Sequence, residues 1–297
     1  MGDSQDNNNN HSGDNGDDDW SCCNDSQTLF VLLYIAFCAI ALVTWKSLLA
    51  KPMRLMSVFL HEMSHAVACW ISGGTVYNME VYENEGGVTR YAGGCRCLII
   101  PAGYCGVSIW SMIFVILSGG RKTATVAASV LTFCLLLALC YSPNKTLVYI
   151  SLAYATVTAA CIYIEWAVYT PLLQFVILFY GVLIGLFAVA DIHDDTIIRT
   201  SERSDAYACS TGVWPCCYPK VIGLQWAIFA LVCQIAGIYI ALAAMSDQCE
   251  DKTWLNCLSS SHGLGDVWDD RRWDFEGFWE QQDFQLNFDQ WGGGNGH

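Results

Sequence analysis

Seven apolar stretches, separated by short polar connections, divide most of the chain. They cover residues 28–45, 53–72, 97–118, 123–142, 146–170, 175–198 and 221–245. A transmembrane helix needs about 20 mostly apolar residues, with a range of roughly 17 to 25. The pattern therefore predicts an all-α polytopic membrane protein with about seven transmembrane helices.

A different pattern follows the second stretch. A Gly73-Gly74 pair opens a segment in which β-branched and aromatic residues alternate with polar ones, and a polar turn at residues 83–87 separates its two halves. Alternation with period two around such a turn is typical of a β-hairpin. We therefore expect a small membrane-associated hairpin directly after the second helix.

The polar ends of the chain complete the predicted domain organisation. Residues 1–27 form an acidic N-terminal tail, residues 28–45 the first transmembrane helix, residues 53–245 a membrane-embedded core, and residues 246–297 a C-terminal tail. The N-terminal tail has almost no apolar residues to bury, and we expect both tails to be disordered. The C-terminal tail alternates acids with Trp and Phe, which is typical either of a peptide that binds a protein partner or of a solvated tail that dips its rings into the membrane interface.

Composition supports a membrane protein and narrows its partners. Hydrophobic residues make up 54% of the chain and charged residues 14%, against about 25% charged residues in soluble domains. The net charge of −14 comes from the tails, since residues 1–27 carry −7, residues 246–297 carry −8 and the rest carries +1. A nucleic-acid partner requires a basic patch, so we expect no nucleic acid and take the lipid bilayer as the surrounding partner.

The second stretch contains the sequence His61-Glu62-Met63-Ser64-His65. On a helix, residues four apart lie on one face, so both imidazoles can bind one zinc ion while Glu62 acts as general base on a water molecule. Ionisable residues are costly inside a membrane span and indicate function. The alternative is a helix whose histidines bond to backbone or line a polar seam between helices.

A catalytic zinc site usually takes three protein ligands, so a further ligand is needed. Asp191 lies seven residues before the end of the 175–198 stretch, and His65 lies seven residues before the end of the 53–72 stretch. If both spans run in the same direction, Asp191 meets the histidines at one depth. We therefore predict Asp191 as the third ligand, with Asp195 in reserve on the same helix face.

A hairpin beside a zinc site has two interpretations. A substrate strand could add to its edge, because proteolysis requires an extended backbone and a helix hides its peptide bonds. On this interpretation Gly73, Gly74, Val76 and Val81 bind substrate. The other interpretation is a plain surface hairpin.

Several segments together resemble the site-2 protease superfamily of intramembrane zinc metallopeptidases, and more narrowly its divergent peptidase M50B-like branch without a PDZ domain. The resemblance covers residues 53–245. It is carried by the motif at residues 59–66, the Gly73-Gly74 exit, the hairpin, the Pro101-Ala102-Gly103-Tyr104-Cys105-Gly106 helix, Asp191 and the sequence Ser204-Asp205-Ala206.

The resemblance implies an intramembrane zinc metalloprotease that hydrolyses peptide bonds in or near transmembrane segments of membrane proteins. It implies His61, His65 and Asp191 as zinc ligands, Glu62 as the group that activates water, and a transmembrane protein as substrate. The better-studied members place their aspartate in a Leu-Asp-Gly motif, and this chain contains no Asp-Gly pair. That departure supports the alternative of a catalytically silent, protease-like scaffold or regulatory binding protein. A multipass transporter is a third interpretation, although the ionisable residues cluster in a hydrolytic pattern.

Overall fold

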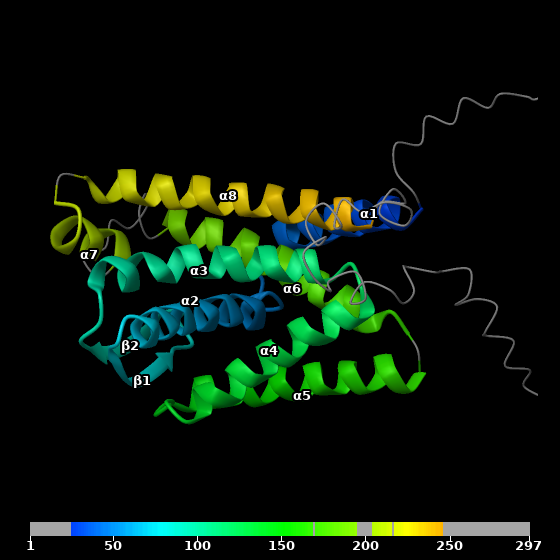
Figure 1. Cartoon of the computed structure of the whole chain (residues 1–297), viewed down its shortest axis with the longest axis horizontal. Coiled ribbons are helices and arrows are strands. Elements are labelled where there is room, and N and C mark those ends of the chain that lie inside the picture. Colours follow the sequence, from blue (N-terminus) through cyan, green and yellow to red (C-terminus); the bar gives the residue numbers. More distant parts are fainter. Residues whose placement is uncertain (1–24, 169, 195–203, 216, 246–297) are drawn as a thin grey trace, which may run out of the picture.

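The computed structural model of the chain describes residues 25–168, 170–194, 204–215 and 217–245. Within these residues lie eight helices and two strands (Figure 1). They are α1 (Asp25–Thr44), α2 (Lys51–Ile71), β1 (Thr75–Val81), β2 (Gly87–Ala92), α3 (Arg96–Leu117), α4 (Arg121–Leu139), α5 (Lys145–Val168), α6 (Leu172–His193), α7 (Asp205–Gly212) and α8 (Pro219–Ala244). The predicted fold class, a helical membrane protein with a small hairpin after the second helix, is confirmed.

Six of the described helices are long and apolar enough to cross a membrane: α1, α3, α4, α5, α6 and α8. The helix α2, predicted as a seventh span, forms over nearly the predicted residues but does not belong to this set. It carries Lys51, Arg54 and Glu62, and two thirds of its residues are buried. It packs against α3, α5, α6 and both strands. The helix with the His-Glu motif is therefore enclosed by other elements.

Helix α3 is the centre of the bundle and packs against α2, α6 and α8. Its contact with α6 is close because Gly181 lacks a side chain: a Cβ there would lie 2.8 Å from Val115 Cγ2 and 2.9 Å from the Val115 backbone nitrogen. Small residues at such contacts let membrane helices approach each other. Ser111 of α3 donates a 2.6 Å hydrogen bond to the Gly181 carbonyl and accepts one from Gln234 of α8. These contacts fix α3 relative to α6 and α8.

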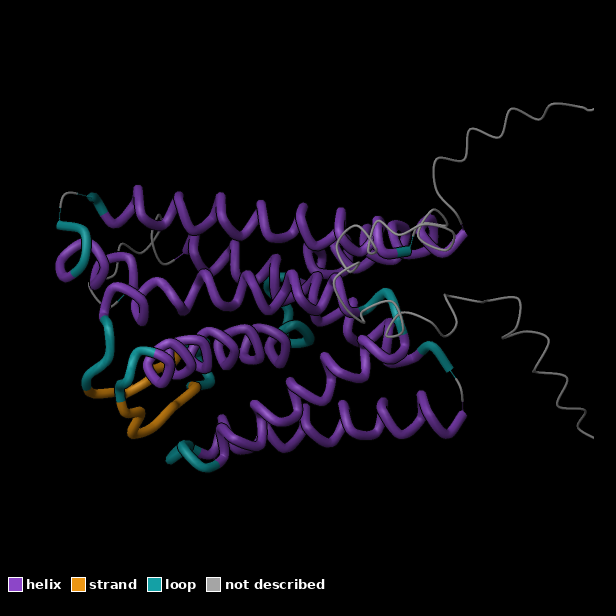
Figure 2. The backbone as a smooth tube through the Cα atoms, viewed as in Figure 1, coloured by secondary structure: helices purple, strands orange, loops and turns teal. Residues whose placement is uncertain are grey.

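The two strands form one antiparallel sheet at one end of the bundle (Figure 2). Met79 and Val81 of β1 are fully buried. The Met79 backbone N–H donates to the Tyr141 carbonyl (2.9 Å), and the Asn144 side chain donates to the Val81 carbonyl (2.6 Å). The connection between α4 and α5 therefore covers the outer edge of β1 and anchors the hairpin to the bundle.

Helix α7 lies at the same end of the molecule as the hairpin (Figure 1). It begins after Ser204, whose hydroxyl accepts a 3.3 Å hydrogen bond from the Tyr207 backbone N–H, as an N-cap residue does. Ala206 and Cys209 are buried in a cluster with Tyr104 of α3 and other apolar residues of α3, α6 and α8. The short helix is thus docked by its apolar face, which fixes the residue at its first position, Asp205.

The predicted tails lie outside the described residues, apart from residues 25–27, which begin α1. Their predicted disorder, and the proposed partner of the C-terminal tail, stay predictions.

Candidate metal centre

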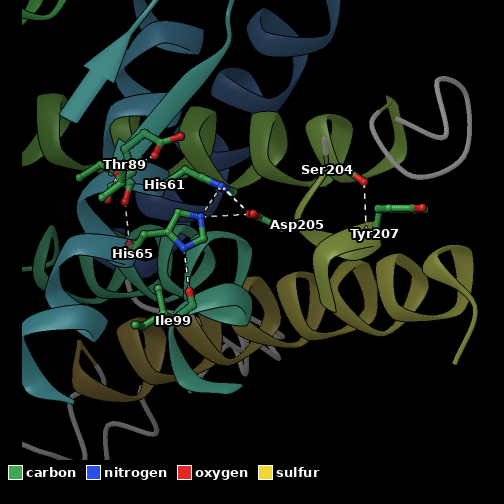
Figure 3. Close-up of polar contacts among 10 residues, drawn as sticks. His61, His65, Thr89, Ile99, Ser204, Asp205 and Tyr207 are labelled. Atoms are coloured by element: carbon green, nitrogen blue, oxygen red, sulfur yellow. Dashed lines mark hydrogen bonds and ion pairs between the residues drawn. The ribbon is translucent and has the colours of Figure 1, made fainter. Parts of the chain in front are cut away.

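His61 and His65 project from the same face of α2, as their spacing predicts. The centroids of their rings lie 4.7 Å apart, and their Nε2 atoms are separated by 3.0 Å. The Asp205 Oδ2 atom lies 2.9 Å from His61 Nε2 and 3.0 Å from His65 Nε2 (Figure 3). Two nitrogens and one carboxylate oxygen therefore converge from α2 and α7.

The separation of these atoms fits a metal ion at their centre. Zinc bonds of about 2.0–2.2 Å to nitrogen and oxygen, in tetrahedral geometry, place neighbouring ligand atoms about 3.3 Å apart. The three ligand atoms lie within 4.8 Å of one another, and the contacts from Asp205 are only slightly shorter than that spacing. A small adjustment of side chains brings the three groups to the geometry of a zinc site.

The hydrogen bond of His65 fixes which of its ring nitrogens is available to a metal. His65 Nδ1 lies 2.7 Å from the carbonyl oxygen of Ile99, which can only accept a hydrogen. Nδ1 therefore carries the proton, and in the neutral ring the lone pair is on Nε2. That lone pair faces a carboxylate oxygen of Asp205. Two acceptors 3.0 Å apart repel each other unless a cation, a proton or a metal ion, lies between them, so the arrangement of donors favours a cation site.

Asp205 is suited to remain ionised. Burial alone raises the pKa of its carboxyl group. When the cation between the groups is a proton, the charge of protonated His65 and hydrogen bonds from His61 and His65 outweigh this effect and hold the pKa below its usual range. The side chain of Asp205 nevertheless stays 24% exposed. The site therefore has an open side, as a catalytic metal site requires for its substrate.

Helix α3 forms one wall of the site. Gly103 faces the imidazoles so closely that a Cβ there would lie 2.5 Å from His61 Nε2 and from His65 Nε2. Next to it, the Tyr104 ring contacts the His61 ring edge to face, with centroids 4.5 Å apart. Gly103 thus leaves the space that the two metal-binding nitrogens occupy.

A methyl group at this position should disturb the metal centre without removing a ligand. We expect Gly103→Ala to displace the imidazoles and to weaken zinc binding at least about tenfold, the scale typical of lost support around a metal ligand. Competition with a chromophoric chelator measures the affinity, and Ile109→Ala, a change on an exposed part of α3, is the control. Wild-type affinity in Gly103→Ala would contradict the close approach of α3.

Glu62 is buried beside the histidines, with 5% of its surface exposed. The Thr89 hydroxyl of β2 lies 2.6 Å from its Oε2 atom and 3.1 Å from its backbone carbonyl oxygen. A Cβ at Gly87, two residues earlier on the strand, would collide with the Glu62 carboxyl group. The hairpin therefore packs directly on the predicted general base.

The structure brings Asp205, and not Asp191, to the two histidines. Asp191 is half-buried near the end of α6 and is not part of the metal-binding group among the described residues, and Asp195 lies outside them. The depth predicted for Asp191 relies on a helix that continues to residue 198, and residues 195–203 lie outside the described part of the chain. That depth therefore stays a prediction. The available signal for Asp205 was the sequence Ser204-Asp205, which is typical of a helix start. It lies between the apolar stretches at residues 175–198 and 221–245.

The four predicted substrate-binding residues occupy two kinds of position. Gly73 has a positive φ of 80° and, with Gly74, turns the chain from α2 into β1. Val76 and Val81 are buried, at 5% and 0% exposure. Their contact with substrate stays a prediction.

Comparison with known proteins gives one match. A family model described as Peptidase M50B-like matches residues 34–237, which is more than half of the chain and includes α2, the hairpin and α7. No curated protein and no solved structure matches.

Proposed function

The chain belongs to the Peptidase M50B-like family, which is site-2 protease-like, and on this premise we propose that it is a zinc metalloprotease that cleaves membrane proteins in or near their transmembrane segments. Its six candidate spans and its family make it a multi-pass integral membrane protein. The observation that carries the proposal is the convergence of His61, His65 and Asp205 beside Glu62.

Zinc is the metal that this set of ligands favours. Two imidazole nitrogens and one carboxylate form the three-ligand set typical of catalytic zinc, with a further position left for water or substrate. When bound, zinc supplies a Lewis acid for the scissile carbonyl and for the attacking water. The proton held on His65 Nδ1 by the Ile99 carbonyl keeps its Nε2 available for this role.

Glu62 moves the protons of the reaction. Its carboxylate takes a proton from the attacking water as the new carbon–oxygen bond forms, and returns it to the leaving nitrogen as the peptide bond breaks. The products are a carboxylic acid and an amine, so the carboxyl group of Glu62 ends the cycle as it began.

An extended substrate fits the open edge of the hairpin at β2. The Met79 backbone N–H points away from β2 to Tyr141, so Met79 and its partner Thr89 form a pair without hydrogen bonds to each other, and the Thr89 backbone groups also point outward. In the described part of the chain, no backbone group of another element hydrogen-bonds to β2. A substrate strand added at this edge would pass next to the residue that contacts Glu62. This proposal assigns the substrate to β2, since β1 is covered.

The catalytically silent scaffold is the second candidate. Its support in the sequence was the lack of an Asp-Gly pair and the acidic-aromatic C-terminal tail. Asp205 supplies a carboxylate at the histidines without that motif, so the motif is not needed for a complete set of ligands.

Removal of the metal tests the proposed function. We expect purified protein in liposomes to cleave single-span reporter proteins, and 1,10-phenanthroline to lower the rate by at least about 100-fold, because no residue replaces the Lewis acid. Added zinc should restore the rate, and the non-chelating isomer of phenanthroline is the control. Cleavage that persists after complete removal of zinc would contradict a zinc protease, and a zinc-loaded protein that cleaves none of a broad set of reporters would favour the scaffold.

A further inference from the structure

The hairpin contacts the predicted general base through the side chain of Thr89, which is not part of the metal-binding group. The Thr89 hydroxyl, 2.6 Å from Glu62 Oε2, is placed to donate its hydrogen to this oxygen. Each carboxylate oxygen has two lone-pair sites, so this hydrogen bond fixes Oε2 and still leaves the carboxylate able to take a proton. A buried carboxylate with a single defined donor has a restricted orientation, which a proton-transfer group requires.

A second residue of the same strand restricts the carboxylate from another side. Gly87 and Thr89 are two residues apart and therefore lie on the same face of β2. A Cβ at Gly87 would lie 2.7 Å from Glu62 Cγ and 2.8 Å from Glu62 Cδ. The carboxyl group thus lies against the Gly87 backbone while Thr89 holds one of its oxygens.

The strand that carries Thr89 is itself held in place. Thr89 is paired with Met79 of β1, whose side chain is fully buried. The Met79 backbone is anchored to the Tyr141 carbonyl by a 2.9 Å hydrogen bond. The hydroxyl is therefore supported by a chain of contacts that runs from the α4–α5 connection through both strands to Glu62.

From these contacts we propose that Thr89 is a positioning residue: its hydroxyl orients the Glu62 carboxylate for proton transfer, and its backbone, at the open edge of β2, places the substrate strand beside that carboxylate. The proposal rests on the proposed function and assigns to the hairpin a part in catalysis as well as in binding. A purely structural role is the competing explanation, because the same hydroxyl lies 3.1 Å from the Glu62 backbone carbonyl and could simply clamp β2 to α2.

Two substitutions separate these roles. Thr89→Val keeps the shape and removes the hydroxyl, whereas Thr89→Ser keeps the hydroxyl. We expect Thr89→Val to lower kcat about 10- to 100-fold, the effect of a misplaced catalytic group, with KM and zinc content unchanged. Thr89→Ser should retain kcat close to the wild-type value. Thr75→Val, at an exposed position on β1, controls for the loss of a hydroxyl from the hairpin.

A combined variant tests whether Thr89 acts through Glu62. Once Glu62→Gln has removed the base, the further change Thr89→Val should cause no additional loss of residual activity. Wild-type kcat in Thr89→Val would overturn the proposal. Equal losses in Thr89→Val and Thr89→Ser, together with a lower melting temperature, would also overturn it in favour of a clamp.

An infrared measurement tests the contact between the Thr89 hydroxyl and the Glu62 carboxylate independently of activity. The carboxylate band of Glu62 is identified as the difference between the spectra of wild type and Glu62→Gln. This band should shift in Thr89→Val and remain in place in Thr89→Ser. If the wild type cleaves no reporter, the proposed function fails, but a shifted band in Thr89→Val still supports the positioning of Glu62 by Thr89. An unshifted band in Thr89→Val would overturn the positioning role whatever the activity.

Discussion

Glu62→Gln should abolish cleavage and leave the metal centre loaded. Gln has nearly the same shape as Glu but cannot take a proton from water, and loss of a general base typically lowers a rate about 100- to 10,000-fold. His61, His65 and Asp205 are unchanged in this variant, so zinc content should remain at the wild-type level. Reporter cleavage in liposomes, with zinc measured in the same sample, checks both parts of the expectation.

The control for this substitution is Glu83→Gln, which neutralises an exposed acid in the turn between β1 and β2. It should cleave at the wild-type rate. Cleavage by Glu62→Gln at more than a tenth of the wild-type rate would mean that another group acts as the base. Loss of zinc from Glu62→Gln would instead mean that Glu62 holds the metal centre together.

Asp205→Ala should lose its zinc, and Asp191→Ala should keep it. Asp205 contributes the oxygen that lies 2.9 Å and 3.0 Å from the two histidine nitrogens, and two imidazoles alone bind zinc weakly. We expect the affinity for zinc to fall more than about 100-fold. This loss exceeds the one caused by removing a residue that only supports a metal ligand. Elemental analysis after dialysis against a competing chelator gives the zinc content per chain.

Asp191→Ala is matched to Asp205→Ala because both remove a half-buried acid at a helix end. Thermal melting of both variants in detergent shows whether each remains folded. Zinc retained in Asp205→Ala and lost in Asp191→Ala would reverse the assignment and return the third ligand to α6.

The sequence was sufficient for the part of the site that depends on local geometry. His61 and His65 lie on one face because any helix places residues four apart together, and Glu62 follows within the same turn. The hairpin was likewise predicted from residues close together in the chain. Such features depend on the period of a helix or a strand, and the apolar pattern determines which period applies.

The third ligand could not be found in the same way, because it depends on how α7 docks against the bundle. Asp205 is 140 residues from His65 in the chain. Its position depends on the packing of Ala206 and Cys209 against α3, α6 and α8, which no local pattern shows.

The hairpin edge shows a further limit of local patterns. Alternation predicted both strands, but it could not show which edge of the sheet stays open. That depends on the connection between α4 and α5, whose Tyr141 backbone carbonyl and Asn144 side chain cover the edge of β1. The same holds for α2. Its apolar residues predicted a span, whereas its surroundings of α3, α5, α6 and the hairpin enclose it.

X-ray absorption at the zinc edge of the purified protein tests the central claim most directly, because it identifies the atoms bound to the metal. The structure predicts zinc with two imidazole nitrogens and with oxygen, at about 2.0–2.2 Å, and a changed spectrum in Asp205→Ala. The chain also contains 16 cysteines. Sulfur neighbours at about 2.3 Å would place the metal at cysteines instead and contradict a centre formed by His61, His65 and Asp205.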